Sequence, residues 1–84
     1  MCTYVTTTAP VAGSAYAGDD WFAVNRAVVY FDHPQDAPLD HALCVDVWGN
    51  RERVAVELDA ASARALAEAI LATLDSDEVA PLLQ

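Results

Sequence analysis

Four stretches with the residue patterns of β-strands follow one another along the first two thirds of the chain. They are residues 2–8, 21–32, 39–48 and 51–58. The first is rich in Thr, Tyr and Val, the next two are longer apolar runs, and the last alternates between polar and apolar side chains. Such segments predict strands. Residues 9–20, which hold two of the three glycines, predict a loop between the first two strands.

Residues 60–74 predict a helix after the last strand. Strong helix formers fill this stretch, and Asp59 before it is a good N-cap. Arg64 and Glu68 have the spacing of an i, i+4 ion pair. The apolar residues fall at helical spacing on one side of the helix. This apolar stripe consists of Ala63, Leu66, Ala67, Ile70, Leu71 and Leu74.

Gly49 and Asn50 predict a two-residue hairpin turn between the last two strands, with glycine in the first position as in a type II′ turn. The resulting cross-strand pairs include Trp48 with Arg51, Asp46 with Arg53, and Val45 with Val54. The Asp46 and Arg53 pair joins opposite charges, which stabilises a sheet.

The preceding hairpin has a matching register when His33 is set opposite His41. This register pairs Phe31 with Leu43, Val29 with Val45, and Ala27 with Val47. The apolar positions of neighbouring strands then share one face, and a slip by one residue would break that agreement.

Together these patterns predict an α+β fold: a four-stranded antiparallel sheet in the order ββββα, with one C-terminal helix packed on one face. The chain is predicted to be a single domain, residues 1–84, with an ordered core over residues 2–74 and an acidic tail at 75–84. The helix is expected to cover the face that carries Leu43, Val45, Val54, Val56 and Leu58. The other face carries Phe22, Val24, Val28, Tyr30, Cys44 and Trp48. Since monomers seldom expose such a patch, we expect this second face to form a sheet-to-sheet homodimer.

Thirteen acidic residues against four arginines and no lysine give the chain a net charge of −9. So acidic a protein has little with which to neutralise phosphates, which argues against nucleic acid and anionic membranes as partners. We expect neutral or cationic partners, or further copies of the chain. The sequence shows neither a signal peptide nor an apolar stretch of about 18 residues, so we expect a cytoplasmic protein with free thiols.

Two histidines and a cysteine form the first candidate site. The predicted register places His33 and His41 side by side, at a separation that lets two imidazoles share a metal such as zinc, iron or copper. Asp32 is the candidate carboxylate for orienting an imidazole. Cys2 lies toward the same end of the sheet; with Met1 removed, its amine and thiol make it a candidate nucleophile or metal ligand. On this hypothesis the protein binds a metal or transforms a small neutral or cationic metabolite.

The second face of the sheet is the alternative site. Tyr30, Cys44 and Trp48, with Arg26 as a cation, form an apolar surface that suits a hydrophobic acid or a dimer interface. On this hypothesis the protein is a noncatalytic homodimer that binds a hydrophobic small molecule or a partner protein. The sequence contains no phosphate-binding glycine loop, which argues against a nucleotide-dependent enzyme. Catalytic and noncatalytic functions therefore both stay open.

Several short motifs of the chain resemble those of a small uncharacterised bacterial family. The shared motifs are the opening Met1-Cys2-Thr3, the pair Trp21-Phe22, the segment Tyr30-Phe31-Asp32-His33-Pro34 with Ala37-Pro38-Leu39 and His41, and the run from Arg53 to Leu58 that leads into Ser62 to Leu66. The resemblance covers most of the chain up to about Leu74. That family is a domain of unknown function, so the resemblance implies no activity, substrate or cofactor. It implies that Cys2 and the segment from Asp32 to His41 are family features.

Overall fold

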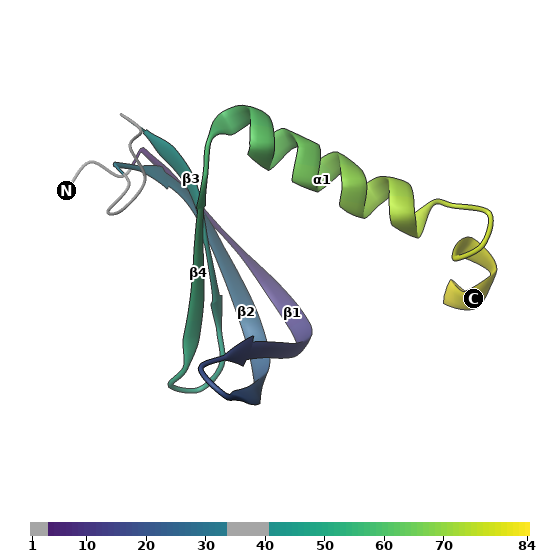
Figure 1. Cartoon of the computed structure of the whole chain (residues 1–84), viewed down its shortest axis with the longest axis horizontal. Helices are drawn as coiled ribbons and strands as arrows, with labels where there is room; N and C mark the ends of the chain where they lie inside the picture. The colour runs from purple at the N-terminus through teal and green to yellow at the C-terminus, as the bar shows by residue number, and fades with distance from the viewer. Residues whose placement is uncertain (1–3, 34–40) are drawn as a thin grey trace.

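Four antiparallel strands form one open sheet that is followed by a helix (Figure 1). The structure, a computed structural model, describes residues 4–33 and 41–84. The elements are β1 (Val5–Ala17), β2 (Asp20–Asp32), β3 (Ala42–Trp48), β4 (Arg53–Leu58), the helix α1 (Ala60–Leu74) and the 3₁₀ helix η1 (Ala80–Leu83). The strands lie in sequence order, with β1 and β4 at the two edges. This architecture confirms the predicted α+β fold and its ββββα order.

The register of β2 against β3 is the predicted one. The structure pairs Phe31 with Leu43, Val29 with Val45, and Ala27 with Val47. Continuing this ladder by one step sets His33 opposite His41. The apolar positions of the two strands therefore share a face, which is the constraint that selected this register.

The predicted loop at residues 9–20 is wrong, because β1 runs through most of it and is joined to β2 by a tight turn at Gly18 and Asp19. Gly18 has a φ of 67°, which favours glycine. Ala, Gly, Ser and Pro have low strand propensity, but antiparallel pairing with β2 supplies their hydrogen bonds. Pro10 is tolerated because β1 is an edge strand.

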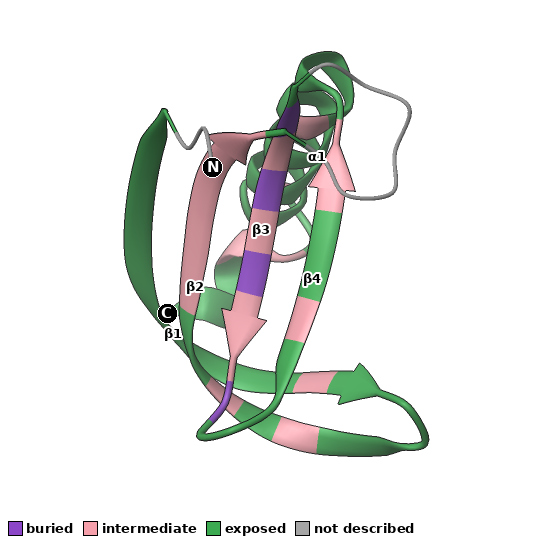
Figure 2. Ribbon diagram, turned by 90° about the vertical axis from the view of Figure 1, so that its left-hand side faces the viewer, coloured by how far each residue is buried: buried purple, intermediate pink, exposed green. Residues whose placement is uncertain are grey.

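The hairpin of β1 and β2 bends sharply halfway along its length. Between Pro10 and Gly13 of β1 the register shifts, so that two residues of β1 face a single residue of β2. Such a β-bulge bends the strand that carries it. The far half of the hairpin turns across the end of β3 and β4 (Figure 2). There the Asn25 side chain of β2 donates to the Asn50 side chain at 3.5 Å.

The predicted turn between β3 and β4 is wrong by one residue. The structure pairs Trp48 with Arg53 instead of Arg51, so the two central residues of the turn are Asn50 and Arg51. Gly49 is a flanking residue whose N–H donates to the carbonyl of Glu52 at 2.9 Å. Its glycine serves a close approach: a Cβ there would lie 2.5 Å from the carbonyl oxygen of Ala23. The strand pairing is shifted by two residues, and because this number is even each side chain keeps its predicted face.

The helix α1 has the predicted bounds and the predicted cap. The Asp59 carboxylate accepts a hydrogen bond from the Ser62 N–H at 2.7 Å, and the hydrogen bonds from Ser62 lower the pKa of Asp59. The helix meets the sheet mainly at β3, through its first turns, and then extends away from it (Figure 1). Of the apolar stripe only Ala63 is half-buried, and its other five residues are exposed. The acidic segment after Asp75 contains η1.

The sheet encloses almost no interior. Among the described apolar residues only Ala42 and Cys44 are buried, and neither is large. In Figure 2 the buried positions lie on β3 and just after it, whereas most of β1 and α1 is exposed. Half-buried side chains of β2, β3 and β4 supply the rest of the packing.

Replacing Gly49 by alanine is expected to destabilise the fold. The added methyl group would lie 2.5 Å from the Ala23 carbonyl oxygen and 2.9 Å from the Phe22 ring. Overpacking of this kind costs about 1–3 kcal/mol of unfolding free energy. Urea unfolding measures the difference. The matched control is Gly13→Ala, whose methyl group meets nothing within 4 Å, and equal effects of the two substitutions would contradict the assigned role of Gly49.

Candidate functional site

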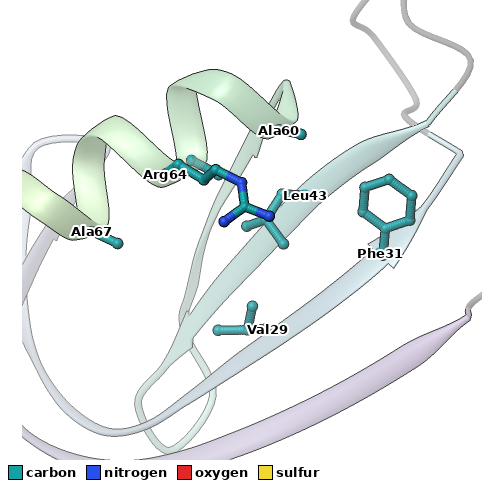
Figure 3. A pocket seen from close by; sticks show the side chains of 7 residues that line it. Val29, Phe31, Leu43, Ala60, Arg64 and Ala67 are labelled. Carbon is teal, nitrogen blue, oxygen red and sulfur yellow. The ribbon is translucent and has the colours of Figure 1, made fainter.

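The two faces of the sheet differ in chemistry, as strand alternation requires. The apolar face carries Ala27, Val29, Phe31, Leu43, Val45, Val47, Val54, Val56 and Leu58. The mixed face carries Arg26, Val28, Tyr30, Cys44, Asp46, Trp48, Arg53, Ala55 and Glu57. None of these apolar-face residues is charged. The helix α1 stands over the apolar face (Figure 3).

The predicted histidine pair is present at one end of the apolar face. The ring centroids of His33 and His41 are 5.0 Å apart and their planes are inclined by 27°. His41 also stacks on Phe31, with centroids 5.7 Å apart, and its Nε2 lies 3.2 Å from the Tyr4 hydroxyl. Two imidazoles and two aromatic rings thus form one cluster. The sequence predicted the contact between the two histidines but not the contact of Tyr4 with His41.

Of the two residues predicted to accompany the histidine pair, the structure describes Asp32. Cys2 lies outside the described residues. The Asp32 carboxylate accepts a hydrogen bond from the backbone N–H of His33 at 2.7 Å, so it lies beside the pair. Across residues 4–33 and 41–84, no three histidine, cysteine or acidic side chains gather as a metal-binding group. Among the described residues, this site therefore offers two imidazole ligands.

On the mixed face, arginines cover the tryptophan. The guanidinium carbons of Arg26 and Arg53 lie 4.9 Å and 5.5 Å from the centroid of the Trp48 ring. Both contacts are cation–π interactions. Arg51, the predicted neighbour of Trp48, instead lies in the turn, because the strand pairing is shifted. The surface predicted to bind a ligand or a second copy thus has charged groups over its largest ring.

The predicted charge pair of Asp46 and Arg53 forms, although the two residues are diagonal neighbours in the sheet. Arg53 Nη1 lies 3.1 Å from Asp46 Oδ2, and the Tyr30 hydroxyl donates to the same oxygen at 3.2 Å. Burial, and next the Asp46 charge, raise the pKa of Tyr30. The other oxygen, Oδ1, is buried without a partner among the described residues. Tyr30, Asp46 and Arg53 thus form one polar cluster on the mixed face.

Cys44 is placed as a structural residue. It is 2% exposed, and its thiol donates to the Ala42 carbonyl oxygen at 3.7 Å. Burial raises the pKa of the Cys44 thiol, and the charges of neighbouring carboxylates raise it further. Both effects disfavour the thiolate, which is the reactive form of cysteine.

An open cleft lies between the apolar face and the first turns of α1. It has a volume of about 420 Å³. Its lining consists of Val29, Phe31 and Leu43 from the sheet with Ala60, Ala63, Arg64 and Ala67 from the helix (Figure 3). Phe31 joins the cleft to the histidine pair, because His41 stacks on its ring.

Arg64 is the site residue that sequence reasoning missed. Its predicted i, i+4 ion pair with Glu68 does not form. The ion pair found among the described residues joins Arg53 to Asp46. The guanidinium instead lies between the helix and the sheet, over Leu43 (Figure 3). The sequence places Arg64 beside the apolar stripe, but only the position of α1 relative to the sheet turns it toward the cleft.

These features define a small α+β protein with an apolar cleft and an adjoining histidine pair. The chain matches a family of unknown function, DUF6295, over residues 1–82, and it belongs to that family. This finding confirms the resemblance to a domain of unknown function. No curated protein and no solved structure matches the chain. In the described part of the chain, no helix is long and apolar enough to span a membrane.

Cys44 is expected to resist thiol reagents in the folded protein. In a Cys2→Ala variant Cys44 is the only thiol, so its reaction with a chromogenic disulfide at pH 8 can be followed directly. We expect a rate at least about a hundredfold below that of the same variant unfolded in urea, because reaction needs local opening and ionisation. Equal rates in the two conditions would show that Cys44 is accessible and reactive.

Proposed function

We propose that the protein is a binding module for a small apolar carboxylic acid, held in the cleft between α1 and the apolar face. One observation carries this proposal: a single guanidinium, that of Arg64, lies over a cleft otherwise lined by apolar side chains. Such a site binds the apolar part of a ligand by burial and orients it through one polar group. The free thiol of Cys44 supports a reducing compartment such as the cytoplasm.

The size of the cleft suits a small ligand. Its volume of about 420 Å³ lies in the range of small-molecule sites, roughly 300–1,000 Å³. Each buried methylene of a bound chain contributes about 0.8 kcal/mol, so a medium-length alkyl chain supplies most of the affinity. The lining offers a phenyl ring and two branched side chains from the sheet, and three alanines from the helix.

The charge of the cleft lining favours an anion, although the whole chain has a net charge of −9. The residues of the apolar face are uncharged, and Asp46 and Glu57 point to the opposite face. At physiological salt, charges separated by more than about 8 Å are largely screened in solvent. Among the residues that line the cleft, Arg64 is the charged one, and its planar donors match a carboxylate.

Replacing Arg64 by glutamine is expected to weaken binding of decanoate but not of decanol. An exposed charge-assisted contact contributes up to about 1 kcal/mol, so the loss for decanoate is roughly three- to fivefold. Titration calorimetry with each ligand measures the dissociation constants. Decanol fills the same apolar cleft without a carboxylate, so its affinity reports folding and packing of the variant.

Arg51→Gln is the matched control, because this arginine is exposed and lies in the turn away from the cleft. It removes the same charge from the whole chain. Equal weakening of decanoate by both substitutions would assign the effect to net charge and sink the proposed role of Arg64. Absence of binding by either ligand to the wild-type protein would reject the cleft as a binding site.

A metal-binding function is the second candidate, and the contact of the two histidine rings supports it. Ring centroids 5.0 Å apart suit two ligands of one ion after rotation of the rings. Zinc commonly takes four ligands at about 2.0–2.3 Å, so two imidazoles need further donors. Cys2 is the sequence candidate for one of them. The Tyr4 hydroxyl competes for the Nε2 of His41, which lies 3.2 Å away.

The double substitution of His33 and His41 by alanine is expected to weaken zinc binding at least about tenfold, because each imidazole supplies a direct metal–nitrogen bond. Competition with a chromogenic chelator measures the affinity of the tag-free protein. Asp19→Ala is the control, since it removes one surface carboxylate at the far end of the sheet. Unchanged zinc affinity in the histidine variant would rule out this site.

A further inference from the structure

The single chain leaves more surface exposed than a compact protein of its mass. A monomer of 9.0 kDa is expected to expose about 4,900 Å², whereas this chain exposes 6419 Å². Its radius of gyration is 14.5 Å, against about 12 Å for a compact chain of this length. The excess area is about 1,500 Å² for each chain. A partner that buries about this area would complete the core.

Part of the uncovered apolar surface lies on the apolar stripe of α1. Leu66, Ile70, Leu71 and Leu74 are exposed by 49%, 52%, 60% and 43%. Isolated exposed leucines are ordinary, but a continuous stripe along one side of a helix is the surface that normally packs on a sheet. On β4, Val56 of the apolar face is 42% exposed as well. A helix and a sheet face that suit each other are thus both incompletely covered.

The connection between β4 and α1 explains why the helix does not cover its own sheet. Only Asp59 separates the end of β4 from the start of the helix. This residue is extended, with φ −69° and ψ 164°, and its side chain caps the helix. So short a link sets the direction of α1, which leaves the sheet after its first turns (Figure 1).

We propose that two copies of the chain pair by exchange of their helices, the apolar stripe of each α1 lying on the apolar face of the other copy. The lengths match: the stripe from Ala63 to Leu74 spans about 16 Å, and the face from Leu43 to Val47 spans about 14 Å. Each copy gives a helix and receives one, which forms a closed two-fold assembly. The proposal does not rest on the ligand site.

A second copy is the occupant that the surface area and the charges favour. Two copies together have an excess of about 3,000 Å², within the range of about 2,000–5,000 Å² that obligate homodimers bury. The stripe and the apolar face contain no charged residue, so the net charge of −9 on each copy stays outside the contact. A cationic partner would find no carboxylate on either surface.

This arrangement differs from the sheet-to-sheet dimer expected from the sequence. The large apolar side chains of the mixed face, Tyr30 and Trp48, are half-buried, and Arg26 and Arg53 lie over the Trp48 ring. Pairing two mixed faces would bring two sets of these arginines together. On the opposite side, the stripe residues Leu66, Ile70, Leu71 and Leu74 of α1 and Val56 of β4 are exposed.

The association state of matched helix variants tests the exchange. We expect the wild-type chain to sediment at micromolar concentration as a dimer, twice the 9.0 kDa of one chain. Ile70→Asp places a carboxylate in the stripe and is expected to raise the dimer dissociation constant at least about thirtyfold. Ala65→Asp adds the same group on the opposite side of the helix and should leave the dimer intact. A monomeric wild type, or equal effects of both substitutions, would overturn the proposal.

A measurement on the wild-type sequence covers the case in which Ile70→Asp fails to fold. Copies labelled with carbon-13 are mixed with unlabelled copies, and isotope-filtered NMR then detects only contacts between chains. We expect contacts from the Ile70 and Leu71 methyl groups of one copy to the Val45 and Val56 methyl groups of the other. Contacts of this kind only within one chain, or contacts between chains that join Trp48 to Tyr30, would overturn the helix exchange.

Discussion

The pairing of β2 with β3 determines which side chains share each face of the sheet. Because neighbouring side chains along a strand point to opposite faces, one register sends Val29 and Phe31 to the same side as Leu43 and Val45. A slip by one residue would mix Tyr30 and Asp46 among them. The separation of an uncharged face from a mixed face depends on this ladder. The cleft, the histidine pair and the uncovered helix all lie on the uncharged side.

An open sheet with one helix has too few layers to enclose a core. Folded domains bury apolar side chains between layers, and here α1 covers only part of one face. Small chains bury a lower fraction of their surface than large ones, so the shortage of core is felt more strongly at this size. The shortage explains two features together. It leaves a cleft under the first turns of the helix, and it leaves the rest of the apolar stripe exposed.

The functional proposals all use the apolar side of the sheet. The carboxylic acid site lies under the first two turns of α1, where Arg64 supplies the positive charge. The histidine pair lies at the end of the same face and touches the cleft through Phe31. The proposed helix exchange uses the apolar stripe of α1 from Ala63 to Leu74 and the face from Leu43 to Val47. Of these residues, Leu43, Ala63 and Ala67 also line the cleft. A second copy in the proposed arrangement would therefore border the proposed carboxylic acid site.

The sequence alone determined the features that depend on local pattern. Alternation along the strands, helical spacing after residue 60 and the cap at Asp59 predicted the element order, the two faces and the histidine contact. These features follow from near neighbours or from strict periodicity, so the printed residues contain the information. The strand character of residues 9–17 was not predictable in this way, because Ala, Gly and Ser become a strand there only through pairing with β2.

The tertiary structure decided what depends on the approach of distant segments. Gly49 reads as a turn residue, yet its lack of a side chain serves the passage of Ala23 from another strand. Arg64 reads as the partner of Glu68, yet the direction of α1 places its guanidinium over the cleft. Periodicity states which side of a helix is apolar, but not where the helix points. That direction follows from the single linking residue and from packing, and it is why cleft and uncovered stripe appear only in three dimensions.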